Sequence, residues 1–166
     1  MSCRKKSIIS KASPHTIKKF ELIEEYIKSW AQKLLLTDSC NGLIFIDCMC
    51  NSGVYTDVAG QLVKGTAVRI SEALREAART YTDKNIYIYL NDIDKERVAE
   101  LERHLPQDER NFKIVTSCSD AHELLRTIGH SYMELGTCII SCSTIRMMRL
   151  LTGKHFYRFS VTGVKL

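Results

Sequence analysis

The apolar residues of this chain follow two patterns, and their order along the sequence predicts an α/β fold. Short apolar runs typical of buried strands cover residues 43–46, 86–90 and 112–116. Apolar residues at three- and four-residue spacing predict helices, which cover residues 14–36, 67–80, 95–104 and 120–128. Because strands alternate with helices, the sequence predicts a parallel α/β sheet.

Local signals set the boundaries of these elements. Ser13 and Pro14 suit the N-cap and the first position of the first helix, and Gly129 can close the last one. Residues 57–64 follow neither pattern and are predicted to be irregular. Residues 1–12 are basic and poorly patterned, which predicts a loose arm. A single α/β domain is therefore expected over residues 13–136.

The first predicted strand ends at an acid and opens into a loop of small and polar residues. Asp47 follows the apolar run, and Asn51, Ser52 and Gly53 form the turn. In nucleotide-binding folds the backbone of such a loop approaches the cofactor, and the acid accepts hydrogen bonds from it. Asn51 stands where a second glycine is usual, but asparagine tolerates a left-handed backbone better than other side chains. The alternative is an ordinary turn after a buried strand.

Each of the three predicted strands ends near an acid: Asp47, then Asp92 or Asp94, then Asp120. Ligands of parallel sheets bind at the carboxyl ends of the strands, where these acids are expected to meet. An acid after the second strand would accept hydrogen bonds from both ribose hydroxyls, and Asp120 would accept one from an adenine amino group. The alternative is that Asp94 and Asp120 serve only as helix N-caps.

Composition limits the remaining functions. No apolar run approaches the length of a membrane span and no secretory signal is present, so a cytoplasmic protein is expected. The seven cysteines include no Cys-x-x-Cys pair, which supports neither a zinc site nor a disulfide framework and favours buried reduced thiols. The net charge of +5 arises after residue 136, where five bases occur without an acid. Nucleic-acid binding is therefore not supported.

Four segments carry a resemblance to a known family. They are Ser-Pro-His-Thr at 13–16, Ile-Asp through Gly and Tyr at 46–55, Gly-Thr-Ala at 65–67, and Asn-Asp-Ile-Asp at 91–94. With these the chain resembles the three-Cys-motif partner protein (TcmP) family over about residues 13–130. The resemblance implies a Rossmann-like sheet of the class I methyltransferase type, N-terminal part only. It also implies S-adenosylmethionine as the cofactor and a three-Cys-motif protein as the partner.

The resemblance also assigns roles to particular residues. Asp47, with the turn 51–53, would hold the cofactor, Asp92 rather than Asp94 would bind the ribose, and Asp120 would bind the adenine. His15, in the Pro-His-Thr segment, is the candidate catalytic residue, as an acid, a base or a phosphate contact near the cofactor. Its alternative role is that of a residue at a helix start that hydrogen-bonds the backbone.

The loop departs from the family pattern, because residues 49–51 replace the family's Phe, Ala and Gly. This change favours a second function, a non-catalytic binding module that has lost cofactor binding but still binds the partner. A third function is that of an NAD-type Rossmann domain, which shares the acid after the second strand. Its glycine spacing after the first strand fits less well.

Residues 137–166 differ in character from the rest of the chain, with no acids and no clear period. A family member would have a fourth strand there that ends in Asp-Pro-Tyr. A shifted reading frame of permitted codons for residues 141–159 can encode such a segment, followed by Asp-Trp-Lys-Ala-Leu-Leu-Pro. We therefore expect an out-of-frame tail from about residue 138, a longer native chain, and a poorly stable, inactive product in the present form.

Overall fold

The main sheet has four strands in the part of the chain that the structure, a computed structural model, describes: residues 7–38, 40–132 and 138–141. The spatial order is β6-β5-β2-β7, and every neighbouring pair is parallel. The strands are β2 (Gly42–Asp47), β5 (Asn85–Asn91), β6 (Phe112–Ser117) and β7 (Cys138–Ser141). The three strands predicted from the apolar runs and their parallel arrangement are confirmed.

The chain builds this sheet outward from β2 in both directions. Leu43 of β2 pairs with Ile86 of β5 on one side and with Cys138 of β7 on the other. Strand β7 falls at the start of the segment that the sequence predicts to be out of frame. The rest of that predicted tail, residues 137 and 142–166, lies outside the described residues.

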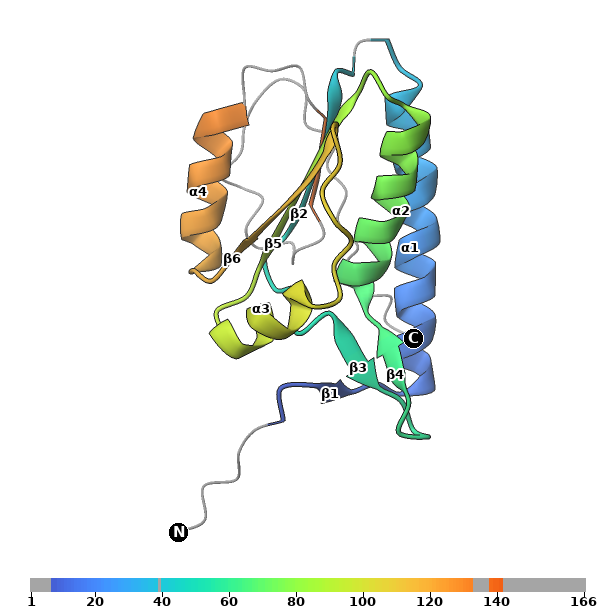
Figure 1. The fold of residues 1–166 in the computed structure, drawn as a ribbon, viewed down its shortest axis with the longest axis vertical. Coiled ribbons are helices and arrows are strands. Elements are labelled where there is room, and N and C mark those ends of the chain that lie inside the picture. Colours follow the sequence, from blue (N-terminus) through green and yellow to red (C-terminus); the bar gives the residue numbers. More distant parts are fainter. Residues whose placement is uncertain (1–6, 39, 133–137, 142–166) are drawn as a thin grey trace.

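Helices cover both faces of the sheet (Figure 1). Helices α1 (Pro14–Leu35) and α2 (Thr66–Thr80) lie on one face, and α4 (Ala121–Tyr132) lies on the other. Helix α3 (Lys95–Glu102) lies near the carboxyl ends of the strands. The four predicted helices are therefore confirmed, with ends shifted by a few residues.

Strand β2 shows how the two apolar cores arise. Its side chains alternate between the two faces of the sheet. Leu43 and Phe45 belong to the core shared with α1 and α2, whereas Ile44 and Ile46 belong to the core shared with α4. All four side chains have 0% exposure, which explains why this strand appears in the sequence as an unbroken apolar run.

Helix α1 begins as predicted, with Ser13 as the N-cap. The Ser13 hydroxyl oxygen accepts a hydrogen bond of 3.2 Å from the backbone N–H of Thr16, and Pro14 follows at the first helical position. The Ser13→Ala variant is therefore expected to lower the free energy of unfolding by about 1 kcal/mol, as measured by urea denaturation.

A second serine of α1 provides the control for that measurement. The exposed Ser29 hydroxyl donates only to the carbonyl of Glu25 within the helix. Alanine is the better helix former, so Ser29→Ala is expected to leave stability unchanged or to raise it slightly. Equal losses in the two variants would contradict the capping role of Ser13.

A second, small sheet corrects two of the predictions. Strands β3 (Val54–Thr56) and β4 (Leu62–Lys64) form an antiparallel hairpin, and β1 (Ser10–Lys11) pairs with β3. Strand β4 and the turn before it fall in residues 57–64, which the sequence predicts to be irregular. The predicted loose arm therefore ends before Ser10. Strands of two or three residues carry too short a pattern to be recognised in the sequence, and these depend on pairing with distant segments.

The end of α4 corrects a further boundary. The sequence predicts that Gly129 closes this helix, but α4 continues to Tyr132. A glycine within a helix costs only about 1 kcal/mol relative to alanine, so it does not by itself end one.

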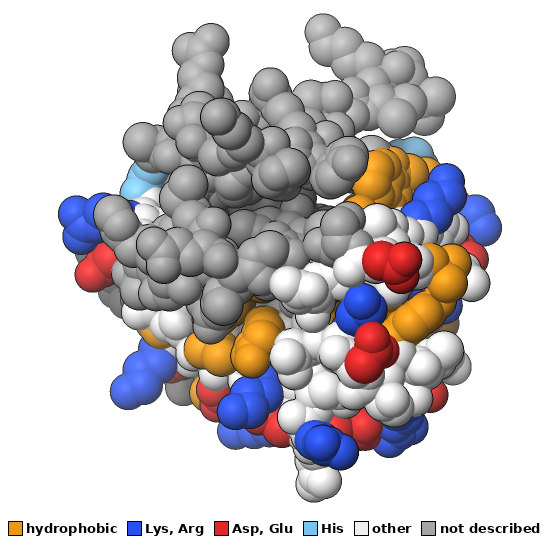
Figure 2. Space-filling view, turned by 90° about the horizontal axis from the view of Figure 1, so that it is seen from above, with side chains coloured by type: hydrophobic (Ala, Val, Ile, Leu, Met, Phe, Trp, Pro, Cys, Tyr) orange, Lys and Arg blue, Asp and Glu red, His pale blue; other side chains and the backbone are white. Residues whose placement is uncertain are grey.

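The charged side chains of the described residues are mixed in sign. On the face shown in Figure 2, Lys and Arg side chains lie among Asp and Glu side chains around the rim. One partly buried ion pair joins α1 to α2: Arg69 Nη1 lies 2.9 Å from Glu24 Oε2. Separately, none of the helices in the described ranges has both the length and the hydropathy of a membrane-spanning segment.

Candidate functional site at the carboxyl ends of the strands

The loops that follow β2 and β5 meet at the carboxyl edge of the sheet. Asp47, the last residue of β2, pairs in register with Leu90 of β5, and the backbone N–H of Cys50 donates to the carbonyl of Asn91 at 2.9 Å. Asp92 follows directly. We call the group formed by Asp47, Asn51 and Asp92 the carboxyl-end site.

The turn after β2 adopts the backbone that its residue types favour. Asn51 has φ of 57° and Gly53 has φ of 71°, both in the left-handed region. The prediction that asparagine can replace glycine in this turn is confirmed. The Asn51 side chain supports the turn, because its Oδ1 accepts a 2.7 Å hydrogen bond from the N–H of Ser52.

Asp92 joins the two loops through its carboxylate. Oδ2 accepts a 3.0 Å hydrogen bond from the N–H of Asn51, and Oδ1 accepts one of 3.0 Å from the N–H of Asp94. The side chain is 6% exposed. A carboxylate has about four acceptor positions, so with respect to the described residues each oxygen retains one for a further donor.

Asp47 has an unusual electrostatic environment for an acid at a strand end. It is 8% exposed, and burial raises its pKa from 3.8 to about 6. The N–H of Met49, which donates to Oδ1 at 3.0 Å, opposes this shift, and the nearby charge of Asp92 adds to it. Among the described residues no lysine or arginine forms an ion pair with either acid. In the described part of the chain the site therefore holds two acids and no ion-paired cation.

Two of the predicted loop residues, Ser52 and Gly53, make contacts within the protein. Ser52 is fully buried, and its hydroxyl donates to the carbonyl of Val54 at 2.9 Å. At Gly53 a Cβ atom would lie 2.3 Å from Leu101 Cδ1 and 2.9 Å from Val68 Cγ2. The missing side chain at Gly53 therefore makes room for packing against α3 and α2, whereas the sequence predicted room for a ligand.

Asp94 and Asp120 both act as helix caps. Asp94 Oδ1 accepts from the N–H of Glu96 at the start of α3, and Asp120 Oδ1 accepts from the N–H of His122 at the start of α4. Asp120 is exposed. The capping alternative is therefore realised at both positions, and of the acids after β5 only Asp92 belongs to the carboxyl-end site.

His15, the candidate catalytic residue, lies exposed in the first turn of α1. This turn is at the same end of the molecule as the carboxyl ends of the strands (Figure 1). Phe20, one turn further along α1, contacts the ring of Tyr55 with centroids 4.8 Å apart. Within the described residues, no hydrogen bond or ion pair links His15 to the carboxyl-end site.

Sequence reasoning missed Asn91, which it placed in the loop after the second strand. The structure makes it the last residue of β5, with 1% exposure. Its amide bonds residues of the loops after both neighbouring strands, at Cys48 and Ser119. The only available sequence signal was an amide residue directly after an apolar run.

The surface beside the site carries exposed apolar side chains, and the described cysteines near it form no disulfide. Met49 is 70% exposed and Ile93 is 79% exposed, on the loops after β2 and β5. Cys48 and Cys50 are buried and form no disulfide, and burial raises the pKa of Cys50. Cys118 is exposed. In the described ranges no three His, Cys, Asp or Glu side chains are placed to hold a metal ion.

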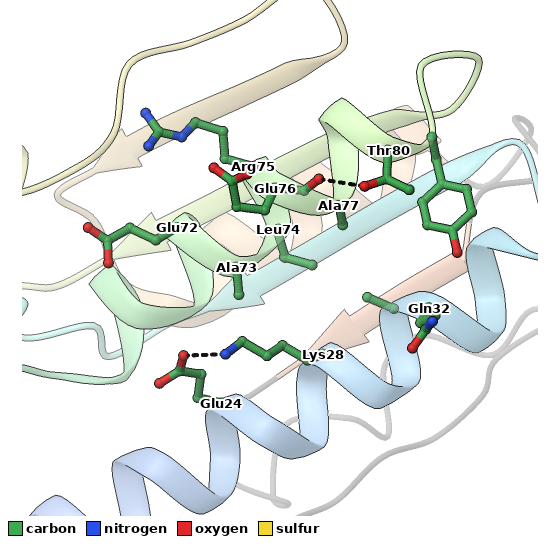
Figure 3. A pocket seen from close by; sticks show the side chains of 12 residues that line it. Glu24, Lys28, Gln32, Glu72, Ala73, Leu74, Arg75, Glu76, Ala77 and Thr80 are labelled. Carbon is green, nitrogen blue, oxygen red and sulfur yellow. Dashed lines mark hydrogen bonds and ion pairs between the residues drawn. The ribbon is translucent and has the colours of Figure 1, made fainter.

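A separate groove lies between α1 and α2 (Figure 3). It measures about 570 Å³, and small side chains such as Ala31, Ala73 and Ala77 line it. On the α1 side Glu24 and Lys28 point toward each other, with Nζ 2.7 Å from Oε1. None of the predicted site residues lines this groove.

Comparisons with protein-family models, with curated proteins and with solved structures found no match for this chain.

Proposed function

We propose that this chain carries a domain that binds S-adenosylmethionine, with the fold of a class I methyltransferase, and that it acts with a three-Cys-motif partner. The observation that carries the cofactor proposal is the position of Asp92. It lies at the carboxyl end of the strand next to β2 and retains one acceptor position on each oxygen. The two vicinal hydroxyls of a ribose are donors that suit this carboxylate.

The strand order supports the fold part of the proposal. The order β6-β5-β2-β7 places the third, second, first and fourth strands of the main sheet side by side. A Rossmann-type sheet begins in this way, and it binds nucleotides at the carboxyl ends of its first strands. The partner part rests on the resemblance of residues 13–16, 46–55, 65–67 and 91–94.

The charge of the site favours S-adenosylmethionine over a dinucleotide. Asp47 and Asp92 are both buried, and the described residues supply neither with a lysine or arginine. A sulfonium or ammonium group would compensate this charge, whereas the pyrophosphate of NAD would add to it. The exposed side chain of Ile93 offers an apolar surface for a flat base beside the ribose position.

A second function, a binding module without cofactor, is favoured by the loop itself. The N–H of Asn51 already occupies one acceptor position of Asp92, and packing of Leu101 fills the space at Gly53. In such a module the loop after β2 would serve only the fold and would leave no space for a cofactor.

Isothermal titration of the purified chain separates these functions. S-adenosylmethionine is expected to bind at micromolar concentration, and Asp92→Ala is expected to weaken binding by about 100-fold or more. This loss corresponds to two hydrogen bonds to a charged acceptor. Asp83→Ala, which changes an acid with a 75% exposed side chain, is the control and should bind like the wild type.

Each other outcome has a defined meaning. No heat and no thermal shift with wild-type protein would support the binding module. Binding of NAD in preference to S-adenosylmethionine would support the dinucleotide-binding domain. Circular dichroism of Asp92→Ala shows whether a loss of binding is accompanied by a loss of fold.

A further inference from the structure

We propose that Asn91 is a positioning residue that fixes the loops of the carboxyl-end site, so that cofactor affinity depends on its side-chain amide. This inference rests on the proposed function, which it extends from Asp92 to the neighbouring residue. Asn91 is 1% exposed and ends β5, the strand that lies between β2 and β6.

Both ends of the amide are fully engaged. Nδ2 donates to the carbonyl of Cys48 at 3.3 Å and to the carbonyl of Ser119 at 2.9 Å. Oδ1 accepts from Ser117 Oγ at 2.8 Å, and from the N–H and the Oγ of Ser119 at 3.0 and 3.1 Å. One side chain therefore holds residues that are 43 and 28 positions away along the chain.

The loop after β2 is attached to the end of β5 at three successive points. The Asn91 amide holds the carbonyl of Cys48, the Asn91 carbonyl holds the N–H of Cys50, and the Asp92 carboxylate holds the N–H of Asn51. The first of these bonds is made by the side-chain amide of Asn91, and the second by its backbone carbonyl, which a substitution leaves in place. The proposed ribose ligand and the loop beside it are thus set relative to each other by this residue.

The side-chain amide of Asn91 is needed because it is surrounded by buried backbone groups that require hydrogen-bond partners. A buried carbonyl or N–H that loses a hydrogen bond is costly, and an apolar side chain at position 91 would remove the amide bonds to the carbonyl of Cys48 and to the carbonyl and N–H of Ser119. The loops would then move toward other partners or water. A network that is fully satisfied and buried holds a single arrangement, which a site that binds a ligand requires.

A second asparagine of this chain provides a matched control. Asn111 Nδ2 donates to three carbonyls, those of Ala78, Tyr81 and Lys84, at 2.8, 3.2 and 2.9 Å. It fastens the C-terminal end of α2, and none of its partners belongs to the carboxyl-end site. Leucine has a similar size, and it removes five side-chain hydrogen bonds at position 91 and three at position 111.

The experiment compares Asn91→Leu and Asn111→Leu in two measurements at a temperature where both are folded. Hydrogen exchange of the ligand-free proteins is expected to show faster exchange at Cys50, Asn51 and Ser119 in Asn91→Leu alone. Titration with S-adenosylmethionine is expected to show at least a 10-fold loss of affinity in Asn91→Leu and a change within about twofold in Asn111→Leu. If Asn91→Leu does not fold, Asn91→Ser, which keeps one donor and acceptor, takes its place.

The two measurements separate failure of this inference from failure of the proposed function. A wild-type protein that does not bind S-adenosylmethionine overturns the proposed function, while hydrogen exchange still decides whether Asn91 fixes the loops. Unchanged exchange at Cys50, Asn51 and Ser119 overturns the positioning role. Wild-type affinity in Asn91→Leu, or equal losses of affinity in both variants, overturns the link to the cofactor.

Discussion

Replacing Gly53 with alanine is expected to lower the free energy of unfolding by about 2–5 kcal/mol. Two separate costs add at this position. Gly53 has φ of 71°, a conformation that costs an L-residue about 1–2 kcal/mol. The new Cβ would also meet Leu101 Cδ1 at 2.3 Å and Val68 Cγ2 at 2.9 Å, and such overpacking typically costs about 1–3 kcal/mol. Urea denaturation followed by circular dichroism measures the loss.

Gly60 separates the two contributions. It has φ of 80°, close to that of Gly53, but no atom lies within 4 Å of the position that its Cβ would take. Gly60→Ala should therefore show only the backbone cost, about 1 kcal/mol after the entropy loss of the unfolded chain is included. Equal effects at the two glycines would contradict the packing role of Gly53.

A double mutant tests the contact itself. Leu101→Ala alone should destabilise the protein, because Leu101 has 0% exposure and belongs to the core shared with α1 and α2. In Gly53→Ala/Leu101→Ala the closer clash, with Leu101, is removed, while the contact with Val68 remains. The combined loss is therefore expected to be smaller than the sum of the single losses by at least about 1 kcal/mol.

The second large effect is the response of stability to pH at Asp47. Burial raises the pKa of this carboxyl from 3.8 to about 6, so the folded state holds its proton more tightly than the unfolded state. The stability that comes from the protonated form is complete below pH 3.8 and is lost as the pH rises through about 6. The shift corresponds to a loss of up to about 3 kcal/mol by neutral pH.

Asp47→Asn removes this dependence while keeping an oxygen that can accept from the N–H of Met49. The variant is expected to exceed the wild type in free energy of unfolding by up to about 3 kcal/mol at pH 7.5, and by much less at pH 4. Asp83→Asn, with its exposed side chain, should follow the wild type within about 0.5 kcal/mol. A difference that does not change between pH 4 and 7.5 would refute the raised pKa.

These two effects bear on the proposed function in different ways. An ionised Asp47 destabilises the ligand-free protein at neutral pH, and a bound cationic group would relieve that cost. Gly53, by contrast, owes its lack of a side chain to Leu101 and Val68. The charge of Asp47 therefore fits the proposed cationic ligand, whereas the missing side chain of Gly53 serves the packing of the loop against Leu101 and Val68.

Much of the fold was predictable because its signals are local. The apolar run of β2, the capping pair Ser13 and Pro14, and the alternation of strands with helices depend only on neighbouring residues. The left-handed backbone of Asn51 was predictable for the same reason, since it follows from the residue type in a short turn.

The predictions failed where the outcome depends on contacts between distant segments. The hairpin of β3 and β4 depends on the pairing of these strands with each other and of β3 with β1. Because the strands are so short, residues 57–64 by themselves show no recognisable period. Asn91 looks like a loop residue until its partners after β2 and β6 are known. The packing role of Gly53 required the position of Leu101, which comes from a helix nearly fifty residues later.

The strand order of the main sheet has a consequence for the order in which the chain can fold. Leu43 of β2 pairs with Ile86 of β5 and with Cys138 of β7. The two partners lie far apart in the sequence, so the central strand gains its two neighbours at very different times during synthesis. Contacts between such distant residues close large loops and slow the search for the native pairing. Strands β2, β5 and β6, with α1 and α2, can assemble while β7 is still being made. During synthesis, the side of β2 that later pairs with β7 stays open as a strand edge throughout that interval, and an open strand edge can pair wrongly.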